Sequence, residues 1–451
     1  MSIRVTMIGA GSGFTVAIAN TLVKSAMMRD CAFVLMDIDR EALDQADARI
    51  RRLNEETGGA LKITATDDCR AAVAGADFVV ASCAPQRMPY WLKDIEIAAR
   101  HGVDLMQGEN GGPAGQIHAL RNITMLADLV AQMKQVCPDA WLMNFVNPMS
   151  MLCTWFRSHA SVRWMGFCHQ VHGSFGVVSE MLGMEPGDLQ VITAGINHMN
   201  FLLDIRRRGH PESYLAPFLE QVRASEYWRK SQSGVPSQVF TLEFLKAFGI
   251  YPVGYDNHIS EYMQLFYSRE EWEARGLMGS ADEILKFQRL AEERTSQRQK
   301  SGTLADVEVW RQIHDAIPFP KELEHPYYEE SPVSVMEALL TGEPLYLDAM
   351  VIENRGCVSN LPDDAIVDIP VTIVGGRARG LDVGALPPFA AELCRRQIAV
   401  HELVAEAAAE GSRQRFFEAL CLDPFVRGMS TAQKIMDDYL EAYRDCLPQF
   451  F

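Results

Sequence analysis

The first half of the chain alternates short apolar runs with stretches of helical spacing. The apolar runs predict strands at residues 3–8, 32–36, 63–66, 77–82 and 141–146. Between them apolar residues recur every three or four positions, most regularly from Ile117 to Met133, and this spacing predicts helices. Strands that alternate with helices build a parallel, doubly wound sheet. We therefore predict a Rossmann-like α/β fold for this half.

The pattern changes after about residue 170. Residues 189–207 predict two strands interrupted at Asn197-His198, and residues 349–376 predict further strands around a turn at residues 360–364. Residues 390–409 predict an amphipathic helix. A chain of 451 residues exceeds the roughly 250–300 residues that one hydrophobic core usually reaches. We therefore predict two domains, a doubly wound one over residues 1–170 and an α+β one over residues 171–451.

A glycine-rich turn follows the first predicted strand and opens the first predicted helix. Glycines allow a tight turn there, and the backbone N–H groups at the start of a helix attract a pyrophosphate. The second predicted strand ends in Asp37, at the distance after Gly13 where a dinucleotide-binding fold has its ribose-binding acid. The pattern predicts NAD rather than NADP, because Asp37 would repel a 2′-phosphate; the alternative is an ordinary strand–helix turn. The residues of the turn that we expect to contact NAD are Gly9, Gly11, Ser12, Gly13 and Phe14.

Charge and cysteine usage narrow the class of protein. The net charge of −17 argues against nucleic acids and anionic membranes as partners. The ten cysteines are scattered without a CxxC pair, which is typical of reduced thiols in the cytoplasm. The N-terminus resembles no secretory signal, and no apolar run reaches the roughly 18 residues of a membrane span. We expect a cytoplasmic protein.

Cys168 and His198 each follow an apolar run. A thiolate and an imidazole can bind a divalent transition metal and leave positions open for substrate. The alternative is a buried structural cysteine and a buried histidine with satisfied hydrogen bonds. Asn147 follows the fifth predicted strand, at the carboxyl edge where doubly wound folds bind ligands, although an asparagine before Pro148 is also common in turns.

Other polar residues are candidates for substrate contact or proton transfer. Glu109 lies in a glycine-rich stretch, residues 108–115, and can accept hydrogen bonds from sugar hydroxyls, or it is a solvated acid. Arg87 precedes two aromatic residues and can contact an anion, or it is a surface arginine. Asp256 and His258 lie at a predicted helix start; either can act as a general base, while Asp256 also fits a helix cap.

In combination these features resemble glycoside hydrolase family 4, the glycosidases that depend on NAD and a divalent metal. The resemblance covers nearly the whole chain and is closest to the α-galactosidase and α-galacturonidase branch. It implies a lactate/malate dehydrogenase-like fold and a reaction in which sugar C3 is oxidised by NAD⁺, C2 is deprotonated, the glycosidic bond breaks by elimination, water adds and C3 is reduced again. The segments that carry it are Ile8–Ser12, Met36–Asp39, Gly108-Glu109, Asn147-Pro148-Met149, Cys168-His169, Gly195–His198 and Asn360-Leu361-Pro362.

The resemblance also implies roles for single residues. Cys168 and His198 would hold Mn²⁺ or another divalent metal. Asp256 is the expected base, with Tyr255 second and His258 in the same segment. His169 would be an acid or a substrate contact. The remaining expected substrate contacts are Asn147, which also lies beside the cofactor, Glu109 and Arg87.

The expected substrate is an α-galactoside or an α-uronide such as a galacturonide or glucuronide. Arg87, His118 and His172 together favour an acidic sugar, which extends the alternatives to a sulfonated hexose. A plain 2-hydroxy-acid-type dehydrogenase and a non-catalytic NAD sensor are the competing functions. The resemblance implies a homodimer or homotetramer, and the charged stretch at residues 284–313 is a candidate contact between subunits.

Overall fold

The computed structural model describes residues 3–105, 107–225, 239–254, 256–263 and 332–451. Tyr255 and the charged stretch 284–313 therefore lie outside the described residues. No helix in the described ranges is both long and apolar enough to cross a membrane.

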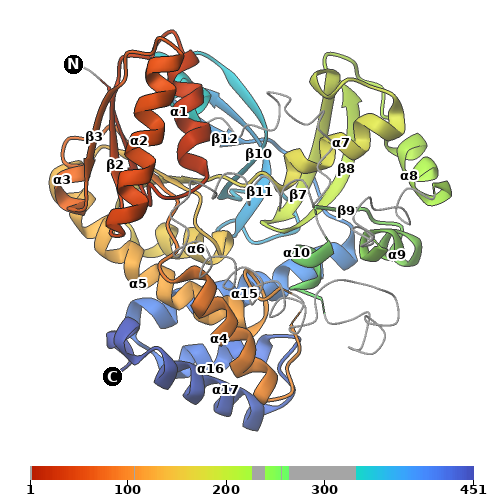
Figure 1. Ribbon diagram of the computed structural model, residues 1–451. Helices are drawn as coiled ribbons and strands as arrows, with labels where there is room; N and C mark the ends of the chain where they lie inside the picture. Colours follow the sequence, from red (N-terminus) through yellow and green to blue (C-terminus); the bar gives the residue numbers. More distant parts are fainter. Residues whose placement is uncertain (1–2, 106, 226–238, 255, 264–331) are drawn as a thin grey trace, which may run out of the picture.

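The first half forms the doubly wound unit that the alternating pattern predicts (Figure 1). Its parallel strands lie in the order β3-β2-β1-β4-β5-β6. The crossover between β1 and β4 puts the end of β1 at the centre of this unit, where doubly wound folds bind ligands. The elements are β1 Arg4–Ile8, α1 Phe14–Lys24, β2 Ala32–Met36, α2 Arg40–Glu56, β3 Lys62–Thr66, α3 Cys69–Val73, β4 Phe78–Ala81, α4 Arg87–Arg100, α5 Gly112–Val136, β5 Trp141–Asn144, α6 Met149–His159 and β6 Arg163–Gly166.

The second half continues the same sheet with antiparallel strands. After β6 the order runs β10-β11-β7-β8-β9, and β12 pairs with β11. The sheet is therefore mixed and continuous through both halves of the described chain. The elements are α7 Gln170–Leu182, β7 Leu189–Ile196, β8 Met199–Arg207, α8 Leu215–Ala224, α9 Val239–Phe248, β9 Pro252–Val253, α10 Asp256–Ser260, α14 Pro332–Thr341, β10 Leu345–Glu353, β11 Ile366–Val374, β12 Arg377–Gly380, α15 Pro388–Glu410, α16 Arg413–Leu422 and α17 Met429–Ala442.

The C-terminal helices return to cover the first half. In Figure 1 the blue helices α15, α16 and α17 lie along the orange helices α4 and α5, with α15 against α5 and α6 and α17 against α4. Arg121 of α5 and Asp94 of α4 form a buried pair with nitrogen–oxygen distances of 2.8 and 2.6 Å. Tyr443, directly after α17, donates a hydrogen bond to Asp94 at 2.5 Å and lies against the Arg121 guanidinium. This buried pair therefore fixes three helices from distant parts of the sequence.

Only part of the glycine-rich stretch at residues 108–115 forms a loop, although its composition predicts a loop throughout. Helix α5 begins at Gly112, so only the first four of these residues form a loop. Gly115 lies inside the helix, and a Cβ there would come 2.6 Å from the backbone carbon of Asn110. The close packing of the loop against the helix therefore explains why this position is a glycine, and no need for backbone flexibility is involved.

Candidate functional site

The turn between β1 and α1 has the geometry of a dinucleotide cradle. Gly9 adopts a positive φ of 84°, and a Cβ there would lie 2.3 Å from the carbonyl oxygen of Ser82 at the end of β4. The backbone N–H of Gly11 donates to Asp37 Oδ2 at 2.8 Å, so the acid that ends β2 reaches the turn. The hydroxyls of Ser12 and Ser82 lie 2.7 Å apart. Only glycine fits at Gly9, and the tight turn it permits lets the backbone approach a pyrophosphate closely.

Cys168 and His198 lie together, although they belong to separate segments of the chain. Cys168 follows β6, and His198 lies in the turn between β7 and β8 with a φ of 65°. The distance from Cys168 Sγ to His198 Nε2 is 3.2 Å. Bonds of about 2.3 Å to sulfur and about 2.1 Å to nitrogen place two ligands of one metal about 3.1 Å apart at a right angle and about 3.6 Å apart at the tetrahedral angle. The observed distance falls between these values, so the pair fits a divalent metal.

Two further metal-binding groups lie beside this pair. The rings of His198 and His258 have centroids 4.1 Å apart. Ligand atoms of His198, His258 and Glu261 lie within 4.8 Å of one another. His258 belongs to α10, and Glu261 follows it directly. The fold therefore brings His198 against the His258–Glu261 pair on one side and against Cys168 on the other.

Burial lowers the pKa of two histidines at this site, His198 and His169. The pKa of His198 is lowered well below its usual value, first by burial and then by the neighbouring His258 and His169. The pKa of His169 is lowered for the same reasons, burial first and His258 second. A neutral imidazole has the lone pair that a metal or a proton needs. His198 Nδ1 is buried and has no hydrogen-bond partner among the described residues.

A hydrogen-bonded network joins Asn147 to the start of α5. Asn147 Nδ2 lies 3.5 Å from Glu109 Oε1, and its carbonyl oxygen accepts a hydrogen bond from Asn122 at 2.6 Å. His118 lies between the Glu109 carbonyl oxygen, at 3.0 Å, and the Asn122 amide, at 2.9 Å. The substrate contacts expected at Asn147 and Glu109 are thus neighbours at the carboxyl edge of β5.

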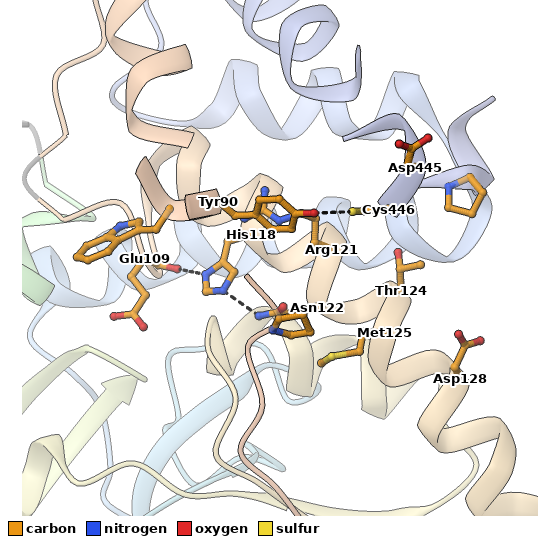
Figure 2. A pocket seen from close by; sticks show the side chains of 13 residues that line it. Tyr90, Glu109, His118, Arg121, Asn122, Thr124, Met125, Asp128, Asp445 and Cys446 are labelled. Carbon is orange, nitrogen blue, oxygen red and sulfur yellow. Dashed lines mark hydrogen bonds between the residues drawn. The ribbon is translucent and has the colours of Figure 1, made fainter. Parts of the chain in front are cut away.

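A cavity of about 330 Å³ opens beside this network (Figure 2). Figure 2 shows His118 with its ring between Glu109 and Asn122, while Tyr90 points toward Cys446. Glu109 belongs to both the network and the cavity wall. The lining residues are Pro85, Tyr90, Trp91, Glu109, His118, Arg121, Asn122, Thr124, Met125, Asp128, Asp445, Cys446 and Pro448.

Asp256, the expected base, is hydrogen-bonded to the start of a neighbouring helix. Its carboxylate accepts hydrogen bonds from the backbone N–H groups of Phe240 (2.8 Å) and Thr241 (3.0 Å) and from the Thr241 hydroxyl (2.8 Å). These donors belong to the first turn of α9, which lies next to α10 (Figure 1). Burial raises the pKa of Asp256 to about 7. The geometry therefore favours the capping role, with the correction that Asp256 caps the neighbouring helix α9 and not its own.

The remaining expected site residues are Tyr255, Arg87, His118 and His172. Tyr255 lies outside the described residues, and so does the side chain of Arg87, the first residue of α4; their roles stay predictions. His118 is hydrogen-bonded within the network above. Burial lowers the pKa of His172 to about 4, so its imidazole is neutral near pH 7. The neutral His172 therefore does not supply the positive charge that the acidic-sugar expectation assigned to it.

Two residues have roles that the sequence did not reveal. Glu261 Oε2 accepts hydrogen bonds from the backbone N–H groups of Glu109 at 2.6 Å, Asn110 at 2.5 Å and Gly111 at 3.1 Å. Gln170 is buried and donates to the carbonyl oxygens of Val253, at 2.8 Å, and His198, at 3.4 Å. Both lie beside predicted site residues, Glu261 three positions after His258 and Gln170 two positions after Cys168, but no feature of the sequence indicated their hydrogen-bond partners.

The fold and the donor set define a dinucleotide-binding α/β protein with a candidate metal site at the edge of its sheet. Two family models match the chain: family 4 glycosyl hydrolase over residues 4–184 and the family 4 glycosyl hydrolase C-terminal domain over residues 193–426. The protein belongs to the family 4 glycosyl hydrolases, as the resemblance predicted.

Relatives of full length carry several substrate names. The chain is 27% identical to an alpha-galactosidase of Bacillus subtilis strain 168, over 99% of each chain. It is 28% identical to an alpha-glucosidase of Erwinia rhapontici, over 94% of each chain. It is 25% identical to an alpha-galacturonidase of the same Bacillus strain, over 97% of each chain. The predicted kinship to α-galactosidases and α-galacturonidases is confirmed, and at these identities the sugar itself stays open.

A solved structure confirms the fold. It is that of a 6-phospho-alpha-glucosidase from gut microorganisms, in complex with NAD and Mn²⁺. The TM-score is 0.77 at 21% identity, and the match covers all of both chains. The predicted Rossmann-like first half and α+β second half therefore follow the architecture of this family.

Proposed function

We propose that the protein is an NAD- and divalent-metal-dependent glycosidase that cleaves α-glycosides through transient oxidation of the sugar. The observation that carries the proposal is the 3.2 Å approach of Cys168 Sγ to His198 Nε2 beside a dinucleotide cradle. A hydrolase that only places water on an acetal needs no such cradle. The structure of a family member with NAD and Mn²⁺ supports the same pair of cofactors.

When bound, the two groups would supply chemistry that side chains lack: NAD would provide a reversible acceptor for hydride, and the metal a positive charge that stabilises negative sugar oxygens. Under this proposal the turn from Gly9 to Phe14 and the Asp37 carboxylate hold NAD. Cys168 and His198 hold Mn²⁺ or a similar ion. The Asn147 amide donates a hydrogen bond to a sugar hydroxyl, and the Glu109 carboxylate accepts one. The two groups lie 3.5 Å apart at the carboxyl edge of β5, so one sugar can contact both.

His169 is the described residue best suited to move a proton. It adjoins the metal-binding cysteine, and its ring centroid lies 6.2 Å from that of Phe14 in the cradle. Its lowered pKa keeps the imidazole neutral, so it can accept a proton at neutral pH. We assign proton transfer to His169 and give Asp256 a positioning role through α9. Tyr255 stays the second candidate for the base, on the strength of the family resemblance alone.

We propose an α-galactoside as the substrate. The alpha-galactosidase relative supports this choice, and the neutral His172 weakens the case for an acidic sugar. An α-uronide is the alternative, because an alpha-galacturonidase is also a full-length relative. A homodimer or homotetramer is the proposed assembly, which light scattering of the purified protein would measure.

The test is turnover with NAD⁺, Mn²⁺ and a panel of p-nitrophenyl α- and β-galactosides, glucosides and uronides. Release of nitrophenol without net NADH supports the proposal, and the preferred glycoside identifies the sugar. Net NADH without bond cleavage would make the protein a dehydrogenase. Full activity of a Cys168→Ser variant would refute the metal assignment.

A further inference from the structure

The short segment that carries His258 is fixed at three points. At its start, Gly254 lies so close to Gln170 that a Cβ would come 1.8 Å from the Gln170 amide nitrogen. In the middle, Asp256 caps α9. At its end, Glu261 accepts three backbone hydrogen bonds from residues 109–111. Three independent anchors along so short a segment leave His258 little freedom to choose where its ring points.

The contact with Glu261 fixes the chemistry of the His258 ring. His258 Nδ1 lies 2.9 Å from Glu261 Oε1. An ionised carboxylate only accepts hydrogen bonds, so Nδ1 carries the hydrogen and donates it. With Nδ1 turned to Glu261, Nε2 is the ring nitrogen that would face a metal, on the edge of the imidazole away from Glu261. This carboxylate–imidazole arrangement is the one that commonly orients metal-binding histidines.

The His258 ring lies against His198, one of the two residues of the metal pair. Its centroid is 4.1 Å from that of His198, whose Nε2 is 3.2 Å from Cys168 Sγ. Ligand atoms of His198, His258 and Glu261 all lie within 4.8 Å of one another. Three protein ligands with one or more open positions are the usual set for a catalytic metal.

We propose that His258 is a third protein ligand of the metal held by Cys168 and His198, and that Glu261 is the positioning residue that fixes its tautomer. The inference rests on the metal-binding part of the proposed function and adds a ligand to it. Glu261 also ties the loop that carries Glu109 to the metal, because one of its oxygens accepts from that loop while the other accepts from His258. Metal affinity and the position of a substrate-binding acid are therefore coupled through a single carboxylate.

The test measures metal binding directly, with the full-length protein freed of metal by a chelator. Co²⁺ reports a thiolate ligand by its near-ultraviolet charge-transfer band and its coordination number by its visible bands. Mn²⁺ affinity is measured by titration calorimetry. The variants are His258→Gln, Glu261→Gln and Cys168→Ser, and His210→Gln at an exposed histidine is the matched control.

The proposal predicts a distinct pattern. His258→Gln keeps the thiolate band, changes the visible bands and weakens Mn²⁺ binding about 100-fold or more. Glu261→Gln weakens it about 10–100-fold, the range seen when a group that orients a ligand is removed. His210→Gln binds as the wild type does. An unchanged affinity and unchanged visible bands in His258→Gln would overturn the proposal.

Two further results separate this inference from the proposed function. If Cys168→Ser binds Co²⁺ as the wild type does, the metal assignment of the proposed function fails as well. If Cys168→Ser loses binding while His258→Gln does not, only the third ligand is wrong. If His258→Gln fails to fold, electron spin-echo spectroscopy of the Mn²⁺-loaded wild type counts the imidazole nitrogens coupled to the metal. Two coupled nitrogens are predicted. A single coupled nitrogen would overturn the proposal.

Discussion

Replacing Asp256 distinguishes a helix cap from a catalytic base. In an Asp256→Ala variant the N–H groups of Phe240 and Thr241 and the Thr241 hydroxyl lose their acceptor. Loss of a cap costs about 1–2 kcal/mol, and buried donors left without a partner add about 1–3 kcal/mol. We expect the free energy of unfolding to fall by about 2–5 kcal/mol in total. Asp256→Asn keeps one acceptor oxygen and should lose less.

The pH dependence of this effect follows from the raised pKa. The folded Asp256 has a pKa of about 7 against 3.8 for an ordinary aspartate, so the folded state binds more protons between these values. Its contribution to stability is therefore full below pH 3.8 and is lost as the pH rises through 7. The loss is about 1.4 kcal/mol per pH unit, or about 4 kcal/mol in all. Asp256→Asn does not titrate, so its stability relative to the wild type should improve from pH 5 to pH 8.

Urea denaturation at the two pH values measures stability, and turnover of the preferred glycoside measures function. As a cap, Asp256→Asn should retain kcat within about tenfold, whereas loss of a general base lowers it by about 10²–10⁴. Thr241→Val is the matched control, since it removes only the hydroxyl hydrogen bond at 2.8 Å. A folded Asp256→Asn variant with kcat reduced a thousandfold, beside an active Thr241→Val variant, would refute the capping assignment and restore Asp256 as the base.

Three other variants test separate parts of the structure. His169→Gln should lower kcat by about 10²–10⁴ without changing the urea midpoint, and normal turnover would exclude His169 from proton transfer. Arg121→Met leaves Asp94 buried without its cation and should destabilise by about 3–5 kcal/mol in urea, while Arg121→Met with Asp94→Leu should recover part of the loss. Burial lowers the pKa of His401 to about 3, so the unfolded state alone takes up that proton below pH 6.5. Stability should then fall by about 1.4 kcal/mol per pH unit on acidification, and His401→Leu should show a shallower fall.

The fold was predictable where one local pattern decides the structure. The buried strands β1, β2, β4 and β5 follow apolar runs, and their predicted ends differ from the observed ones by at most two residues. The start of α5 was not predictable, because Gly112 and Gly115 are typical loop residues. Gly112 adopts a positive φ of 69°, and a Cβ at Gly115 would lie 2.6 Å from the backbone carbon of Asn110. Such contacts depend on where another segment lies and leave no periodic signal.

The residues of the candidate site also differ in whether a local pattern could predict them. Single residues at strand ends, such as Cys168 and Asn147, could be predicted as candidates because parallel strands bring their carboxyl ends to one edge. The hydrogen-bond partners of α10 and of Glu261, which follows it, could not be predicted in this way. Glu261 reaches backbone groups in the first half of the chain, and Asp256 caps a helix that precedes its own. A single sequence shows that an acid is present but does not show which helix or loop it faces.

Under the proposed function, bond cleavage proceeds through loss of the proton at sugar C2. The most direct measurement is hydrolysis of the preferred α-glycoside carrying deuterium at C2, in ordinary water with NAD⁺ and Mn²⁺, followed by mass spectrometry of the released sugar. We expect the released sugar to have exchanged its C2 deuterium for solvent hydrogen. Release of sugar that retains all of its deuterium, at a rate equal to that of the unlabelled substrate, would contradict it.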